Sequence, residues 1–204
     1  MTMKASENYF DIDDILASNE RIPCRVELPI YRLGYLDSSH ESEHLLPGTK
    51  IEFPYWLGRA VCSRRRHIVR VDLPKQYREG YREILSADAT VVDLHKLGPY
   101  YYSFGTKLLH FEHVASADIA KSMVKTFQTR FRKIMDSSQN AYNEDTSKLT
   151  EKLDEAERSL FRSGQFGLHD FQRWETRKTE KLTTSNMVRN HQKRKRNVMD
   201  SNVD

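Results

Sequence analysis

Apolar side chains recur at short, regular intervals between Ser116 and Trp174, and this pattern predicts two long amphipathic helices. In the first helix the spacing is four residues throughout, which places the apolar residues on one side of a helix with 3.6 residues per turn. Basic residues such as Lys125, Arg130 and Lys133 lie between them, so we expect the opposite side to be solvated. The predicted apolar stripe consists of Ile119, Met123, Phe127, Phe131 and Met135.

The first helix is predicted to end in a polar turn at residues 136–145, where turn-forming residues are dense. Asp145 or Thr146 would cap the second helix, because a short side-chain oxygen accepts a hydrogen bond from a free amide of the first turn. One helix pair makes only a thin core, so these stripes need further helices from this chain or from another. The second stripe consists of Leu149, Leu153, Ala156, Leu160, Leu168, Phe171 and Trp174.

In the N-terminal third of the chain, apolar residues recur at every second position, which is the period of β-strands. Alternating apolar and polar residues predict strands at 24–28, 50–53 and 67–73. A module of this size is too short to bury a generous core, so we expect it to lean on a neighbouring domain. A short helix is predicted after Pro54, with an inner face of Trp56, Leu57, Ala60 and Val61.

A short helix is also predicted at residues 11–16. Acidic residues occupy its first turn, where the helix dipole favours them, and Ile12, Ile15 and Leu16 form a small apolar face. A single turn does not fold alone, so this arm must dock on something. We favour docking on its own domain over docking on a partner.

Pro74 marks a change from strand patterns to helical patterns. The segment Tyr100–Phe111 is the most aromatic of the chain and is apolar on nearly all sides. Such a helix is buried within a domain or between chains. We therefore predict an α+β, mainly α, fold, with an arm and a small β-rich domain at 1–74, a helical-bundle domain at 75–180, and a basic, largely disordered tail at 181–204.

The charge of the chain is concentrated near its end. The formal net charge is +4, and Arg189 together with 193–196 supplies five positive charges, so the rest of the chain is nearly neutral. A nucleic-acid-binding domain more often carries a basic face on its folded body, which argues against DNA binding as the main activity. No apolar run approaches the roughly 20 residues that span a bilayer, and no secretory leader is visible at the N-terminus. The two cysteines lack a metal-binding spacing, and a reducing compartment is the default.

No group of residues in the sequence forms a recognisable catalytic motif. The chain has neither a glycine-rich phosphate loop nor a nucleophile elbow. His110, His113 and Asp118 superficially suit a metal, but packing or capping histidines are the favoured interpretation. Cys62 lies near three arginines that could lower its pKa, yet a structural cysteine is favoured because no base is readable beside it. We predict no catalytic residue, no cofactor and no metal, and the acids Asp11, Asp13 and Asp14 are interpreted as helix-start residues.

Two basic segments leave alternatives open. Arg64–His67 could contact phosphate or an acidic partner, or could be a solvated turn. The segment of Lys193, Arg194, Lys195 and Arg196 has the composition of a nuclear-import address, or of a solubilising end. An independent nucleic-acid-binding protein that uses both segments is therefore a competing hypothesis, and it would lose affinity steeply with salt. An enzyme is the least favoured class.

Several runs of residues together carry a specific pattern, and the longest of them is 131–147. The other runs are Asp13–Leu16, Leu57 after Pro54-Tyr-Trp, Val92–Lys96, Leu108–Phe111 and Asp170–Trp174. These runs resemble one family, the third Psf subunit (Psf-three) of the GINS complex. The resemblance covers nearly the whole chain and departs mainly in the loop at 37–48 and in the far tail.

The resemblance implies a structural subunit and not an enzyme. GINS subunits pair a small β-rich (B-type) domain with a larger helical (A-type) domain, and in this family the B-type domain comes first. The resemblance implies a nuclear heterotetramer with three sister GINS subunits, which joins the MCM motor ring and a Cdc-type accessory protein in the replicative helicase during initiation and elongation of DNA replication. It implies DNA contact that is at most indirect, and no membrane.

We can nominate interaction residues from the stripes and the arm. The candidates for contact with sister subunits are Tyr101, Phe104, Leu108, Phe111, Met123, Phe127, Phe131, Leu149, Leu153, Leu160, Phe171 and Trp174. The candidates for docking of the arm or contact with the motor are Asp13, Ile15, Leu16, Trp56 and Leu57. The candidates for nuclear import are Lys193, Arg194, Lys195 and Arg196.

Overall fold

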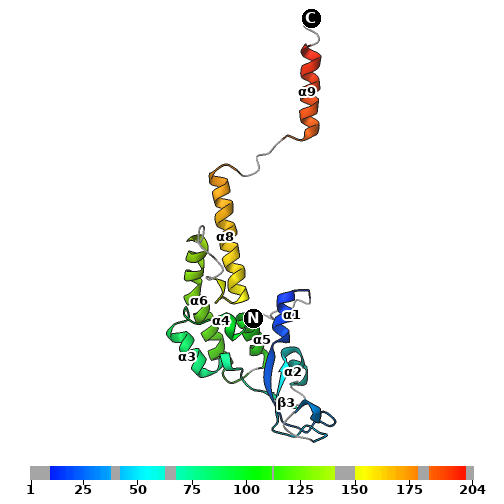
Figure 1. The fold of residues 1–204 in the computed structure, drawn as a ribbon, viewed down its shortest axis with the longest axis vertical. Coiled ribbons are helices and arrows are strands. Elements are labelled where there is room, and N and C mark those ends of the chain that lie inside the picture. The colour runs from blue at the N-terminus through cyan, green and yellow to red at the C-terminus, as the bar shows by residue number, and fades with distance from the viewer. Residues whose placement is uncertain are drawn as a thin grey trace. The chain divides into compact units, whose positions relative to one another are not determined.

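The structure is a computed structural model, and it describes most of the chain (Figure 1). The described residues are 10–37, 42–62, 68–111, 113–140, 150–178 and 184–200, with only the backbone described for 196–200. The chain divides into two compact units, Met1–Gly164 and Gln165–Asp204, and each is treated separately here.

A three-stranded antiparallel sheet forms the N-terminal module. Its strands are β1 (Arg21–Val26), β2 (Lys50–Pro54) and β3 (Val69–Val71), in the order β2-β1-β3. Cys24 on the central strand pairs with Ile51 on one side and Val71 on the other. Alternate residues of β1 are buried, as the period of two requires. All three predicted strands are therefore present, although β1 begins and ends earlier than expected.

The short helix α2 (Tyr55–Val61) follows β2 as predicted, but its inner face differs from the prediction. Tyr55 and Gly58 are buried, whereas Trp56 is 55% exposed and Ala60 is also exposed. Gly58 is needed here because a Cβ at this position would collide with the side chain of Ile22 on β1. The close approach of α2 to β1 turns Tyr55 inward and Trp56 outward, so the predicted inner face is wrong for Trp56 and Ala60.

The arm helix α1 (Ile12–Asn19) docks on its own chain, as we favoured. Asp11 caps it by accepting a hydrogen bond from the backbone N–H of Asp13 at 3.1 Å. Asp14 forms an ion pair with the almost buried Lys107 at 2.7 Å. The hydroxyl of Tyr100 donates to Asp13 at 3.3 Å. Polar contacts to the aromatic segment thus hold the arm in place.

The helical part of the first unit follows Pro74. It begins with a 3₁₀ turn at Lys75–Tyr77; α4 and α6 pack against α5, the predicted aromatic helix, and α3 packs against α6. Tyr101, Phe104 and Leu108 of α5 are 2–5% exposed, so the prediction of a buried helix is confirmed. The helices are α3 (Glu79–Ala87), α4 (Leu94–Leu97), α5 (Tyr101–Leu108), α6 (Ser116–Asn140) and α8 (Glu155–Glu175), the last of which extends into the second unit.

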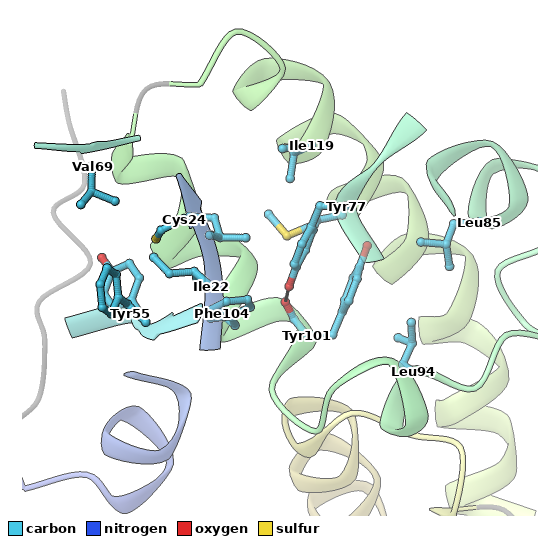
Figure 2. Close-up of a cluster of buried hydrophobic side chains, with 13 residues drawn as sticks. Ile22, Cys24, Tyr55, Val69, Tyr77, Leu85, Leu94, Tyr101, Phe104 and Ile119 are labelled. Carbon is cyan, nitrogen blue, oxygen red and sulfur yellow. Dashed lines mark hydrogen bonds between the residues drawn. The ribbon is translucent and has the colours of Figure 1, made fainter. Parts of the chain in front are cut away.

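One core joins the sheet to the helices. Figure 2 shows Ile22 and Cys24 of β1 in the same buried cluster as Tyr77, Tyr101 and other residues of the helical part. Tyr77 and Tyr101 stack at 5.1 Å between ring centroids, and the Tyr77 hydroxyl donates to the Tyr101 carbonyl at 2.6 Å. The β-rich module therefore leans on the helical part, as its small size predicts.

Helix α6 is longer than predicted, and its buried stripe is different. It continues into the predicted turn as far as Asn140. A spacing of exactly four residues drifts by about 40° per step around a helix of 3.6 residues per turn, so the predicted stripe leaves the core. Phe127 is 37% and Phe131 41% exposed. The stripe that is buried consists of Ile119, Met123, Thr126, Arg130, Ile134 and Ser138.

Helix α8 begins at Glu155, ten residues later than the predicted cap. The predicted caps and Leu149 lie outside the described residues, but Glu151 to Asp154 are described and are not helical. Asp154 starts the helix by accepting a hydrogen bond from the N–H of Ala156 at 3.1 Å. Leu153 is buried in the turn before the helix, and not on it.

The second unit contains the end of α8 and a further helix, α9 (Asn186–Asp200). Within residues 181–204, which we expected to be largely disordered, the structure describes the helix α9, and the expected disorder stays a prediction. The rings of Phe171 and Trp174 on α8 lie 5.8 Å apart. Among the described helices, none combines the length and the apolar composition that crossing a membrane would require.

Candidate subunit-contact surface

A buried ion pair fixes α6 against the start of α8. The guanidinium of Arg130 donates to both carboxylate oxygens of Glu157, at 2.8 and 2.9 Å. Its other N–H groups donate to the carbonyls of Ala89, Val92 and Lys152 at 2.7–3.1 Å. All five donors of the guanidinium are thereby used, which compensates for the cost of burying a charge. The prediction that Arg130 lies on a solvated side of its helix is wrong.

Asp154 and Glu157 extend this network as a capping box. The backbone N–H of Asp154 donates to Glu157 at 3.3 Å, while the Asp154 carboxylate accepts from Ala156 and, at 2.6 Å, from the N–H of Tyr101. Burial raises the pKa of the Asp154 carboxyl to about 7, against the opposing effect of these hydrogen bonds. The start of α8 is therefore tied to the start of α5 as well as to α6.

A row of aromatic rings leads from the core to the surface above this network. Tyr101 packs edge-on against Tyr102, Tyr102 against Phe127, and Phe127 lies 5.8 Å from Phe131. The Tyr102 hydroxyl donates to Glu157 at 2.9 Å, which holds the middle of the row in place. The outer end of the row presents Phe127 and Phe131 to solvent, and Val124, which is 57% exposed, lies one turn earlier on α6.

Both halves of the chain match models of known domains. Residues 10–63 match the PSF3 N-terminal domain, and residues 76–176 match the GINS complex protein helical bundle domain. A Xenopus laevis protein named DNA replication complex GINS protein PSF3 is 52% identical over 195 residues, which cover 96% of this chain and 93% of that protein. The chain belongs to the PSF3 family of GINS complex proteins.

Other relatives agree with this assignment. The Homo sapiens protein of the same name is 52% identical over 194 residues, covering 93% of this chain and 90% of that protein. A Dictyostelium discoideum protein named as a probable PSF3 is 32% identical over 183 residues, covering 89% of this chain and 67% of that protein. The resemblance to the Psf-three family is thus confirmed, and so is the mainly helical α+β fold. The predicted boundary at Pro74 falls between the two matched domains.

Several of the predicted contact residues of this PSF3-family chain are core residues. Tyr101, Phe104, Leu108, Met123 and Leu153 are each at most 7% exposed, so they have almost no surface to offer another subunit. Their apolar pattern reflects the chain's own core, and we no longer nominate them as contact residues. Phe111 and Leu160 are half-buried and pack against the core clusters of this chain.

The exposed candidates lie on α6 and on the second unit. Phe127 and Phe131 form the outer end of the aromatic row on α6. In the second unit, Phe171 is 56% and Trp174 66% exposed, and Phe166, which we had not nominated, is 70% exposed. Leu149 lies outside the described residues. These exposed aromatic side chains are the residues that remain as candidates for a subunit contact.

The arm candidates are partly exposed. Ile15 and Leu16 on α1 are each 45% exposed, while Asp13 is held by Tyr100. On α2, which packs against α1, Trp56 is exposed and Leu57 is half-buried against the core. Exposed apolar side chains on these two neighbouring helices are compatible with an outward contact.

The residues considered for metal binding or nucleophilic chemistry have other roles. His110 Nδ1 lies 3.0 Å from the carbonyl of Lys107, and His113 Nδ1 accepts from the N–H of Ala115 at 3.1 Å. Within the described ranges no group of three or more potential ligands is placed to hold a metal. Burial raises the pKa of the Cys62 thiol, and raises that of Cys24 to about 12, so neither described thiol is activated. Arg64–Arg66 lie outside the described residues.

Sequence reasoning missed the residues that organise this site. Arg130 was placed among the basic residues of a solvated face, and Asp154 and Glu157 were not singled out. The run Asp154-Glu-Ala-Glu157 carries the spacing of a capping box, which would have located the start of α8. No comparable local pattern marks Arg130, because its five hydrogen bonds go to four residues that are all more than 20 positions away in the sequence.

Proposed function

We propose that this chain is a non-catalytic structural subunit of a heterotetrameric GINS complex in DNA replication. Within it, the chain would help to join the MCM motor ring and a Cdc-type accessory protein in the replicative helicase. Membership of the PSF3 family supports this assignment, since the relatives are named as DNA replication complex GINS proteins.

The observation that carries the proposal is the exposed aromatic row on α6. Phe127 and Phe131 lie side by side on a helix whose adjoining face is fixed by the buried pair of Arg130 and Glu157. Rigid, half-exposed aromatic side chains are typical anchors of protein interfaces, because burying them releases much apolar surface at little entropic cost. We propose that this row faces a sister GINS subunit.

The second unit would provide a further contact. Phe171 and Trp174 expose more than half of their surface although they occur at helical spacing on α8. Isolated exposed aromatic residues are ordinary, but a pair in ring contact on one helix is unusual on a surface that stays in water. We propose that a sister subunit covers this pair, and that the exposed residues of α1 and α2 contact the motor ring or its accessory protein.

The same proposal places the protein in the nucleus. The cations Lys193, Arg194 and Lys195 are exposed on α9 and are therefore accessible to an import receptor. The ATPase chemistry of the helicase would belong to the MCM chains. The raised pKa values of the two described thiols and the engaged histidines support a structural role for this chain.

Co-expression with the three sister GINS subunits tests the proposal. Size-exclusion chromatography with light scattering should show one peak whose mass corresponds to one copy of each chain. The chain expressed alone should be poorly soluble and should self-associate as its concentration rises, because its contact surface would be exposed. A stable monomer that does not associate with the sister subunits would contradict the proposal.

A further inference from the structure

Helix α9 carries a dense group of cations that no described acidic side chain neutralises. Arg189, Lys193, Arg194 and Lys195 fall within seven residues, and no acidic residue precedes Asp200 in the helix. Every described side chain from 186 to 195 is exposed. Within the part of the chain that the structure describes, none of the four cations takes part in an ion pair. The helix therefore presents an uncompensated positive charge to solvent.

Packing against the described residues does not stabilise α9. An isolated helix of this length is marginal in water, and most protein helices are stabilised by packing an apolar face. The described side chains of α9 bury no such face. Arg189 and Lys193 are four residues apart, and like charges at this spacing repel each other. A polyanion bound along the helix would remove this repulsion and stabilise the helical state.

The cations surround the helix instead of lining one side. Relative to Arg189, a helix of 3.6 residues per turn places Lys193, Arg194 and Lys195 at about 40°, 140° and 240° around the axis. A helix lying on a flat acidic surface would use only one of these directions. A helix lying in a groove between two charged walls would use most of them, and the major groove of DNA admits an α-helix between two rows of phosphates.

The distribution of apolar residues disfavours a membrane or an apolar protein groove as the partner. Met187 and Val188 are exposed in the first turn, and no apolar residue follows until Val198. An apolar groove or insertion into a bilayer needs a continuous apolar face on the helix, and a flat anionic lipid surface would reach the cations on only one side of it. We propose that α9 binds the phosphate backbone of duplex DNA by lying in its major groove. This goes beyond the indirect DNA contact implied by family resemblance, and it does not depend on assembly with sister subunits.

Salt-dependent binding of the full-length chain to a fluorescent 20-base-pair duplex tests this proposal. Four phosphate contacts predict that log Kobs falls with log salt concentration with a slope of roughly −3.6. The variant Lys193→Ala/Arg194→Ala/Lys195→Ala should reduce the magnitude of this slope by roughly 2.7 and weaken binding at 0.1 M salt on the order of 100-fold. DNA should also increase the helical circular dichroism signal of the wild-type chain more than that of the variant.

A second triple variant provides the matched control. Lys50→Ala/Arg70→Ala/Lys75→Ala removes the same charge from exposed positions of the first unit and should leave the slope unchanged. Equal loss of affinity in both variants would show a nonspecific effect of net charge and would overturn the proposal. Equal binding to single-stranded DNA would contradict a groove, and equal competition by polyglutamate would assign the helix to an acidic protein surface instead.

Discussion

Arg130 and Glu157 form a bidentate ion pair between α6 and α8 in which the two side chains are 4% and 0% exposed. The pair is completed by three backbone carbonyls and by the hydroxyl of Tyr102. It fixes the rotation of α6 about its own axis, since Arg130 must face inward. Phe127 and Phe131 are consequently held outward.

Breaking this pair from one side should destabilise the chain strongly. We expect Glu157→Ala to lower the free energy of unfolding by about 3–5 kcal/mol, because it leaves a buried guanidinium without its counter-ion. Urea unfolding followed by circular dichroism measures the loss. Arg25→Ala is the control, since its pair with Asp72 is exposed and should contribute less than about 1 kcal/mol. A comparable loss in the two variants would argue against the network as the organising contact.

Two glycines of α8 should respond to alanine in opposite directions. A Cβ at Gly164 would collide with the hydroxyl of Ser138 on α6, whose Cβ would lie 3.0 Å away, so Gly164→Ala should destabilise by about 1–3 kcal/mol. At Gly167 no described atom lies within 4 Å of the new Cβ, and Gly167→Ala should stabilise the helix by roughly 0.5–1 kcal/mol. Thermal unfolding of both variants measures the difference. Stabilisation by both would mean that α6 and α8 pack less closely than described.

Asp154 should make stability fall as pH rises. Burial raises the pKa of its carboxyl from 3.8 to about 7 in the folded chain. Between these values the folded chain holds a proton that the unfolded chain has lost, so folding is favoured at low pH and this contribution is lost as pH rises to about 7. Urea unfolding at pH 4 to 8 should show this slope, and Asp154→Asn should lack it even though the variant is less stable overall. Parallel slopes for the two proteins would contradict the raised pKa.

The two cysteines should differ in reactivity. Cys24 is 1% exposed with a pKa raised to about 12, whereas Cys62 is half-buried and its pKa is raised less. Because the thiolate is the reactive form, iodoacetamide at pH 8 should alkylate Cys62 first, and Cys24 only after unfolding. Mass spectrometry of peptides from the folded chain measures both. Early alkylation of Cys24 would show that the sheet opens readily.

The sequence predicted the elements better than it predicted which faces are buried. Strands and short helices followed from local periodicity, and Pro54 and Pro74 directly precede α2 and the 3₁₀ turn at Lys75–Tyr77. The predicted stripe on α6 was wrong because residues spaced by exactly four positions shift gradually around the helix axis. The later residues of the stripe therefore leave the buried face. Thr126, Arg130 and Ser138 are buried by tertiary partners that the local pattern does not contain.

The remaining errors of the sequence-based prediction also arise from contacts between segments that are far apart in the chain. Trp56 is the larger residue, yet Tyr55 is buried because Gly58 brings α2 close to β1. The turn predicted at 136–145 is partly helical because Ser138 packs where α8 has a glycine, and its hydroxyl donates to the carbonyl of Met135. A serine is tolerated inside a helix when its hydroxyl bonds to a preceding backbone carbonyl and its side chain packs against a neighbouring helix.

The aromatic row on α6 provides the most direct test of the structural role. We expect Phe127→Ala/Phe131→Ala to keep the circular dichroism spectrum of the folded chain but to lose the heterotetramer peak on size-exclusion chromatography with light scattering, since aromatic anchors typically contribute about 2 kcal/mol or more each. Tyr35→Ala, which alters an aromatic residue 78% exposed on the N-terminal module, should assemble normally. If the double variant assembles as well as the wild-type chain, the aromatic row is not the subunit-contact surface.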